Sequence, residues 1–94
     1  MTDAELMKTE EWKVALDWLE TKGYFSLEMM DNLSYPLDSV ETVELEVLCE
    51  QRFGILINEV DFDGFTVDTL AGFMRAIVAI RKVKPVRTPD RGRG

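Results

Sequence analysis

The strongest structural signal in this chain comes from residues 38–54, which read DSVETVELEVLCEQRFG. Asp38 is a favourable helix N-cap, and Glu41, three residues later, completes a capping-box pair with it. Gly54 is the kind of residue that ends helices, because glycine adopts a left-handed backbone without a steric penalty. The segment therefore predicts a helix that runs to about Phe53.

This predicted helix carries two apolar stripes. One stripe consists of Leu45, Leu48, Cys49 and Phe53. The other consists of Val40, Val43 and Val47. Carboxylates border the valine stripe, at Glu44, Glu46 and Glu50. A globular helix needs one buried stripe, so the second stripe indicates a surface for a partner protein. The alternative, in which both stripes lie in the core, stays open because small bundles bury wide helix faces.

Two more long helices are predicted on either side. The first begins at Thr2, which forms a capping box with Glu5, and ends at Gly23. Its wide apolar face holds Trp12, Val14, Ala15, Leu16, Trp18 and Leu19. The last helix begins with Thr66 as N-cap and Asp68 in its first turn. Its apolar residues recur at helical spacing: Leu70, Phe73, Met74, Ile77 and Ile80.

The segments between the helices complete the fold prediction. Residues 23–37 have no clean period and predict a long loop packed on the core by its own side chains. Residues 58–65 predict one short helical turn. No segment alternates at period two, so we expect an all-α protein, a small antiparallel four-helix bundle of three longer helices and one short one. We expect one domain over residues 1–83, followed by a basic disordered tail, residues 84–94, rich in Pro, Gly and Arg.

Composition excludes several classes. The chain of 94 residues fits one small domain, and no run of about 18 apolar residues is present to span a membrane. The first residues lack the features of a signal peptide, and the single cysteine suits a reducing compartment, so we expect a cytoplasmic monomer. Residues 1–80 hold 5 Lys and Arg against 17 Asp and Glu. Such an acidic domain is expected to repel nucleic acids and anionic membranes and to attract basic protein surfaces.

No catalytic constellation is evident. The chain has no histidine to act as a base, and Cys49 lies in the core stripe, where a buried inert thiol is expected. Asp61 begins a segment similar to a calcium loop, but position twelve of that loop would be Gly72 instead of the required Glu. We therefore predict neither an active site nor a metal site.

The segment LDSVETVEL, residues 37–45, resembles the signature of the acyl carrier protein family, Asp-Ser-Leu followed by an acidic residue and Thr-Val-Glu-Leu. Val40 and Glu41 are the two conservative replacements. The resemblance continues through residues 53–55, Ile57 and residues 65–67, and covers about residues 37–80 in total.

This resemblance implies a carrier without catalysis of its own. Ser39, preceded by the motif residue Asp38, matches the serine that receives 4′-phosphopantetheine from coenzyme A, and the arm then carries acyl groups as thioesters. The implied partners are a phosphopantetheinyl transferase and acyl-activating, ketosynthase or acyltransferase-type enzymes with basic patches. The implied docking residues are Val40, Val43, Glu44, Glu46, Val47 and Glu50.

Two departures from the family pattern bear on the pathway. Pro36 stands where the family usually has Gly, and the loop before Ser39 is several residues shorter than usual. These differences favour a specialised carrier, in polyketide, lipopeptide or fatty acid biosynthesis. Two alternatives stay open: an aminoacyl or peptidyl carrier, and a carrier-like interaction domain that is never modified.

The resemblance also bears on where the cargo rests. Met29, Met30 and Met74 are unbranched side chains that can re-pack around a guest. We therefore expect a medium-length acyl chain to enter the bundle beside Leu45, Leu48 and Phe73. The alternative, a chain left in solvent with the methionines as ordinary core residues, stays open.

Overall fold

The computed structural model describes residues 1–84, and only the backbone of Met29 and Met30. Residues 85–94 of the predicted disordered tail, residues 84–94, and the proposed re-packing of those two methionines lie outside the described part. Its elements are the helices α1 (Asp3–Leu6), α2 (Glu10–Lys22), α3 (Met29–Leu33), α4 (Ser39–Phe53) and α5 (Leu70–Val83), with a 3₁₀ turn, η1 (Glu59–Phe62), before α5. Residues 1–84 form a compact, mostly helical structure without strands, which confirms the all-α prediction.

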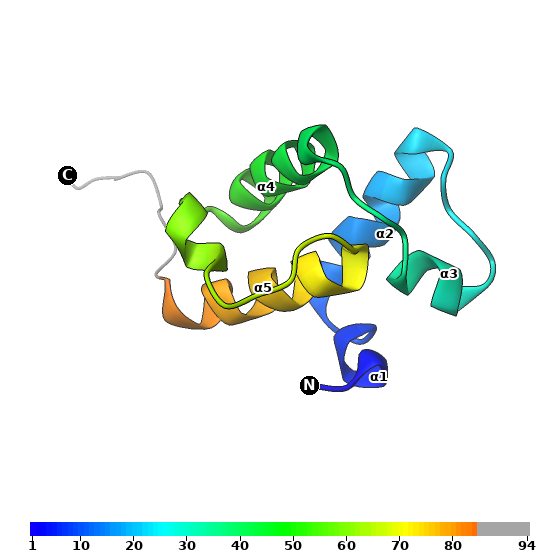
Figure 1. Ribbon diagram of the computed structural model, residues 1–94, viewed down its shortest axis with the longest axis horizontal. Coiled ribbons are helices and arrows are strands. Elements are labelled where there is room, and N and C mark those ends of the chain that lie inside the picture. Colours follow the sequence, from blue (N-terminus) through cyan, green and yellow to red (C-terminus); the bar gives the residue numbers. More distant parts are fainter. Residues whose placement is uncertain (85–94) are drawn as a thin grey trace.

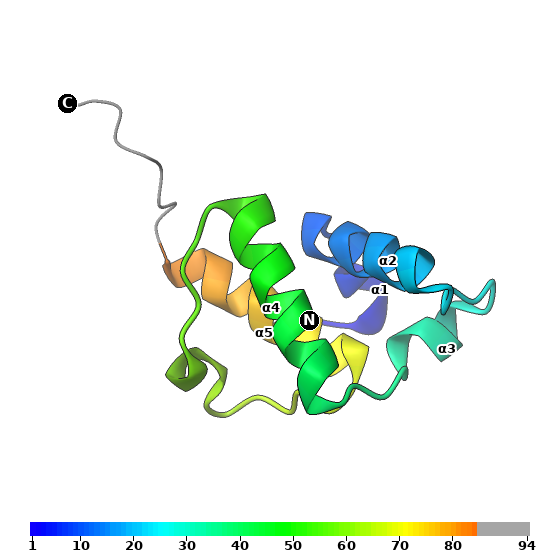
Figure 2. The same ribbon diagram turned by 90° about the horizontal axis from the view of Figure 1, so that it is seen from above.

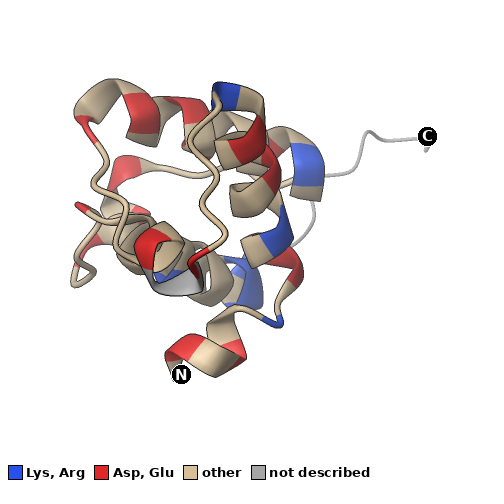
Figure 3. Cartoon of the chain, turned by 90° about the vertical axis from the view of Figure 1, so that its right-hand side faces the viewer, with Lys and Arg blue, Asp and Glu red and all other residues tan. Residues whose placement is uncertain are grey.

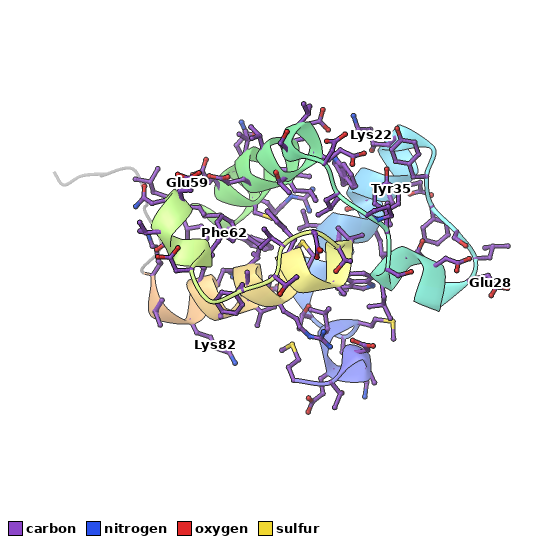
Figure 4. All side chains as sticks on the ribbon, viewed as in Figure 1. Lys22, Glu28, Tyr35, Glu59, Phe62 and Lys82 are labelled. Atoms are coloured by element: carbon purple, nitrogen blue, oxygen red, sulfur yellow. The ribbon has the colours of Figure 1, made fainter. Side chains whose placement is uncertain are left out.

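Helix α5 is the central element of the core. It contacts α1, α2, α3 and η1, while α4 packs against α2 and crosses over α5 (Figures 1 and 2). Its apolar side chains are nearly all buried, in agreement with the predicted helical spacing: Leu70, Phe73, Met74, Ile77 and Ile80. The ring of Phe62, which points from η1 into the fold, lies 5.2 Å from the ring of Phe73 (Figure 4).

Helix α4 has the boundaries that the sequence predicts. The Asp38 carboxylate accepts a hydrogen bond from the Glu41 N–H at 2.8 Å, and the Glu41 carboxylate accepts from the Asp38 N–H at 3.1 Å. Gly54 ends the helix with φ at 65°, in the left-handed region. Local signals therefore fix both ends of this helix.

The prediction of one continuous N-terminal helix is wrong. Thr2 and Glu5 do form the predicted capping box, but α1 ends at Leu6. Thr9 then caps α2: its hydroxyl accepts a hydrogen bond from the Trp12 N–H at 3.1 Å and donates one to the Leu6 carbonyl at 2.7 Å. Helix α1 therefore runs in a different direction from α2 (Figure 1). Leu6, its last residue, is completely buried in the core.

The predicted start of the last helix is also wrong, because α5 is capped by Thr69 and not by Thr66. The residues just before α5 form a short antiparallel bridge with those before α4. The Leu37 N–H donates to the Asp68 carbonyl, and the Leu70 N–H donates to the Tyr35 carbonyl, both at 2.9 Å. These two tertiary bonds flank Thr69, whose backbone is extended, so the helix cannot begin earlier.

The long loop of residues 23–37 contains the short helix α3, which the sequence did not indicate. Asn32, which is buried, organises this region. Its side-chain oxygen accepts from the Ser26 N–H and its side-chain nitrogen donates to the Ser26 carbonyl, both at 2.9 Å. The segment packs on the core as predicted, because Leu33 is buried and α3 contacts α5.

We predict that Gly72→Ala destabilises the fold, although alanine is the better helix former by about 0.5–1 kcal/mol. A Cβ atom at residue 72 would lie 2.1 Å from the Thr66 carbonyl oxygen, a backbone atom that cannot rotate away. We expect a loss of about 1–3 kcal/mol in the free energy of unfolding, as for other overpacked sites. Urea denaturation measures it, with Ala79→Gly in the same helix as the propensity control. A Gly72→Ala protein as stable as wild type would contradict this packing.

Candidate functional site

Ser39 is the first residue of α4, and its side chain is exposed. The Ser39 hydroxyl makes no hydrogen bond with the residues that the structure describes. Its backbone carbonyl accepts a hydrogen bond from the Thr42 hydroxyl at 2.9 Å. The first N–H groups of a helix lack intrahelical acceptors and favour negative charge. A phosphate attached to Ser39 would therefore meet a favourable local field.

Three side chains fix the backbone just before Ser39. The Glu41 carboxylate accepts from the Asp38 N–H with one oxygen and from the Tyr35 hydroxyl, at 2.8 Å, with the other. Burial, together with the hydrogen bond to Glu41, raises the pKa of Tyr35 well above its ordinary value, so its phenol stays protonated and donates at neutral pH. The Asp38 carboxylate is committed to its capping bond, which makes Asp38 a positioning residue for Ser39.

An aromatic cluster supports this turn. The ring of Tyr35 stacks on that of Tyr24 at 5.3 Å and meets the ring of Trp18 edge-on at 6.0 Å. Lys22 and Tyr35 both lie beside the end of α4 that begins with Ser39 (Figure 4). The rings come from α2 and from the segments on either side of α3, so they join three parts of the chain at one place.

Pro36, the departure from the family pattern, lies in the bridge that precedes α5. The hydrogen bonds of this bridge use backbone groups of the two residues that flank Pro36, the Tyr35 carbonyl and the Leu37 N–H. The missing N–H of proline is therefore not needed here, which is the kind of position where a bridge or edge strand accepts proline. Pro36 is thus compatible with an intact turn before Ser39.

The valine stripe of α4 faces solvent. Val40, Val43 and Val47 are 65%, 57% and 44% exposed, whereas Leu45 and Cys49 of the other stripe are completely buried. The alternative in which both stripes belong to the core is therefore wrong. A row of exposed valines on one helix is an apolar surface, which is typical of a site where another molecule packs.

The three glutamates beside the valine stripe have different surroundings. Glu44 accepts hydrogen bonds from the Trp18 indole N–H and from Lys22, and the bonds to Lys22 and Trp18 lower its pKa. Glu50 accepts from the Ile57 N–H at 2.8 Å, which ties α4 to the following loop. Burial and then the charges of Glu50, Glu59 and Asp61 raise the pKa of Glu46. Glu44 and Glu50 thus support the fold, whereas Glu46 has no ion-pair partner in the described part of the chain.

Acidic positions are distributed widely over the molecule. Figure 3 shows them in red from the short helix beside the N-terminus to the helices at the top of the view. Such a field attracts basic partner surfaces over a distance of about a Debye length, 10 Å at 0.1 M salt.

An open groove of about 610 Å³ runs between α2 and α4. Its apolar lining comes from both helices: Trp18, Val43, Val47 and Leu48. Polar side chains form its rim, among them Lys22 and Glu44, which pair at 2.9 Å, and Asp17 and Arg52, which pair at 3.8 Å. The sequence analysis missed this groove, because nothing in the chain indicates how two separate helices diverge.

Cys49 is unavailable for chemistry. The thiol is completely buried, and burial, followed by the nearby charge of Glu11, raises its pKa to about 12. A thiol with such a pKa is not a nucleophile at neutral pH.

Comparisons of this chain with protein-family models, with curated proteins and with solved structures found no match. Within residues 1–84, no helix combines the length and the apolar character needed to cross a membrane.

We predict that Asp38 and Ser39 contribute very differently to stability. Asp38→Ala removes the bond to the Glu41 N–H and should lower the free energy of unfolding by about 1 kcal/mol, as for other lost N-caps. Ser39→Ala removes a hydroxyl without a bond and should change it by less than about 0.5 kcal/mol. Urea denaturation of both variants measures the difference. A large loss for Ser39→Ala would assign Ser39 a structural role instead.

Proposed function

We propose that this protein is an acyl carrier protein that bears a 4′-phosphopantetheine arm on Ser39. The observation that carries the proposal is the exposed, unbonded hydroxyl of Ser39 at the first residue of a capped helix, inside the segment LDSVETVEL. In this interpretation α2, α4 and α5 are the three longer helices of a carrier-like four-helix bundle, and η1 is its short fourth member.

The chemistry requires a nucleophilic hydroxyl that an enzyme can reach. The Ser39 oxygen would attack the phosphorus of coenzyme A that bears the pantetheine group. The new P–O bond replaces the bond between the two phosphates, adenosine 3′,5′-bisphosphate leaves, and the serine proton passes to a base of the transferase. The arm's terminal thiol supplies the thioester chemistry. In this chain, Asp38 and Glu41 hold the serine in place, and no side chain of its own is needed for catalysis.

The valine stripe supports the second part of the proposal, a docking face for basic enzymes. Val40, Val43 and Val47 would supply the apolar contact, and Glu46 the free carboxylate beside it. Glu44 and Glu50 add negative charge to this face, but each is also bonded within the fold. The partners expected here are a phosphopantetheinyl transferase and acyl-transferring or condensing enzymes with basic patches.

We predict that incubation with coenzyme A and a promiscuous phosphopantetheinyl transferase adds one phosphopantetheine per chain. Intact-mass spectrometry measures the adduct, and peptide mapping should place it on Ser39. Ser39→Ala should abolish the addition, whereas Ser34→Ala, the matched control five residues upstream, should retain it.

The outcomes separate the alternatives. Modification that persists in Ser39→Ala would refute the site. A folded wild-type protein that no transferase modifies would favour a carrier-like domain that works by docking alone. Loading of a modified protein by an amino-acid-activating enzyme, but not by an acyl-activating one, would identify an aminoacyl or peptidyl carrier.

We predict that Glu46→Lys slows modification by the transferase several-fold at low salt, and that the effect shrinks as salt screens the charges. Glu46 is the suitable position, because charge reversal at Glu44 would also break its bonds to Trp18 and Lys22. Glu20→Lys, an exposed position on α2, makes the same change of charge elsewhere. Initial rates measured against carrier concentration provide the test. Equal rates for the two variants would exclude this docking face.

A further inference from the structure

Exposed apolar side chains surround the point where the chain leaves α5, at the end of the molecule that η1 and the last turn of α5 share (Figure 1). The lysine that ends α5 connects the elements that carry them: the ammonium group of Lys84 donates to the Leu56 carbonyl at 3.0 Å and pairs with the Asp61 carboxylate at 2.8 Å. The exit surface is defined by Leu56, Val60 and Val83, which are 46%, 68% and 80% exposed.

The chain leaves α5 from a fixed point. Lys84 ends the helix with an extended backbone, at φ −100° and ψ 133°. The next residue is Pro85, and proline disfavours helical geometry in the residue before it. The side chains of Lys84 and Asp61 are only 23% and 19% exposed, so salt screens this ion pair less than an ordinary surface pair. Lys84 is therefore anchored beside η1, and the following residues start from there.

Two carboxylates without a cationic partner border the exit surface. Glu59 is exposed, lies two residues before Asp61 on η1, and makes no ion pair within the described residues. Glu46 of α4 also lacks one, and burial, followed by the charges of Glu50, Glu59 and Asp61, raises its pKa. Glu46 is therefore close enough to the other carboxylates to feel their charge, and a cation placed among them would be favoured.

The opposite side of α5 has no comparable demand for a cation. Arg81 pairs there with Glu10 at 3.3 Å and with Glu11 at 2.9 Å. The uncompensated negative charge at this end of α5 thus lies on the side of η1 and α4.

The sequence after Lys84 has the chemistry that the exit surface lacks. Residues 85–94 read PVRTPDRGRG, so two apolar residues come first, and three arginines follow against one aspartate. The first arginine, Arg87, is separated from Lys84 by at most about 11 Å of chain, at 3.3–3.6 Å per residue. Apolar groups therefore come beside the apolar side chains, and cations come within reach of Glu59.

We propose that residues 85–94 of this chain dock on the exit surface. Their first two residues cover Leu56 and Val60, and their arginines lie beside Glu46 and Glu59. Glu46 also belongs to the docking face proposed for basic enzymes, so the docked tail competes with those enzymes for it. This competition rests on the proposed carrier function, whereas the contact of the tail with the exit surface does not.

The contact is tested in the full-length, unmodified protein. In nuclear Overhauser spectra at low salt we expect cross-peaks between the methyl groups of Val86 and those of Leu56 and Val60. A mixture of isotope-labelled and unlabelled chains shows whether these cross-peaks arise within one chain. Cross-peaks between chains would assign the exit surface to the tail of a second copy and overturn the proposal, and so would their absence in both samples.

Matched acidic variants test the part played by charge. Glu46→Gln combined with Glu59→Gln removes two charges beside the exit surface. Glu20→Gln combined with Glu28→Gln removes two exposed charges elsewhere, and Figure 4 shows Glu28 at the end of the molecule opposite Glu59. Each change lowers the negative charge of an acidic domain, so both proteins should fold. We expect the first pair to weaken the Val86 cross-peaks by at least half, and the second pair to retain them.

The competition is measured by the initial rate of phosphopantetheine transfer at low salt. Arg87→Gln combined with Arg91→Gln should raise the rate several-fold, because Glu46 becomes free for the transferase. Lys8→Gln combined with Lys13→Gln makes the same change in net charge far from the tail in sequence, and it should raise the rate less. The difference should shrink at about 1 M salt, where the Debye length is about 3 Å.

The results separate this inference from the proposed function. If the Val86 cross-peaks are present but both pairs of charge variants react at equal rates, the tail docks without competing, and the competition is overturned. If no transferase modifies the wild-type protein, the carrier function fails and the competition fails with it. The contact of the tail is then still decided by the cross-peaks, because that measurement uses unmodified protein.

Discussion

Two backbone hydrogen bonds, from Leu37 to Asp68 and from Leu70 to Tyr35, hold the start of α4 beside the start of α5. The bridge joins segments that are more than thirty residues apart in the sequence. Because both helices begin directly after it, their relative position follows from this one contact. The bridge between Pro36 and Thr69 therefore links the exposed Ser39 to the central core helix α5.

The turn before Ser39 shows how structural and chemical roles are divided among neighbouring residues. Tyr35 belongs to the bridge through its carbonyl and to Glu41 through its hydroxyl. Glu41 in turn holds the backbone of Asp38. Within the described residues, the side chains of Tyr35, Asp38 and Glu41 all make hydrogen bonds, and the hydroxyl of Ser39 makes none. Such an arrangement keeps the serine available without strain and leaves its side chain no competing partner within residues 1–84.

The parts of the fold that depend on local chemistry could be predicted from the sequence, and those that depend on distant contacts could not. Asp38, Glu41 and Gly54 set the limits of α4 by themselves. The start of α5 could not be located, because Thr66 and Thr69 are both plausible caps and the bridge to Tyr35 decides between them. The break at Thr9 had a local signal, a threonine followed by Glu10 and Glu11, but the apolar pattern of the first 22 residues obscured it.

The candidate site divides in the same way. The segment around Ser39 was indicated by its resemblance to the carrier signature, and the valine stripe of α4 by helical spacing, which left its exposure open. The contacts of Glu44 with Trp18 and Lys22, and the groove between the two helices, depend on the approach of α2 to α4. The burial of Cys49, the chain's single cysteine, has a practical consequence. With that sulfur enclosed and protonated, a maleimide added to the folded protein has no native thiol to alkylate, so reagent uptake would count any pantetheine arm of the kind proposed for Ser39.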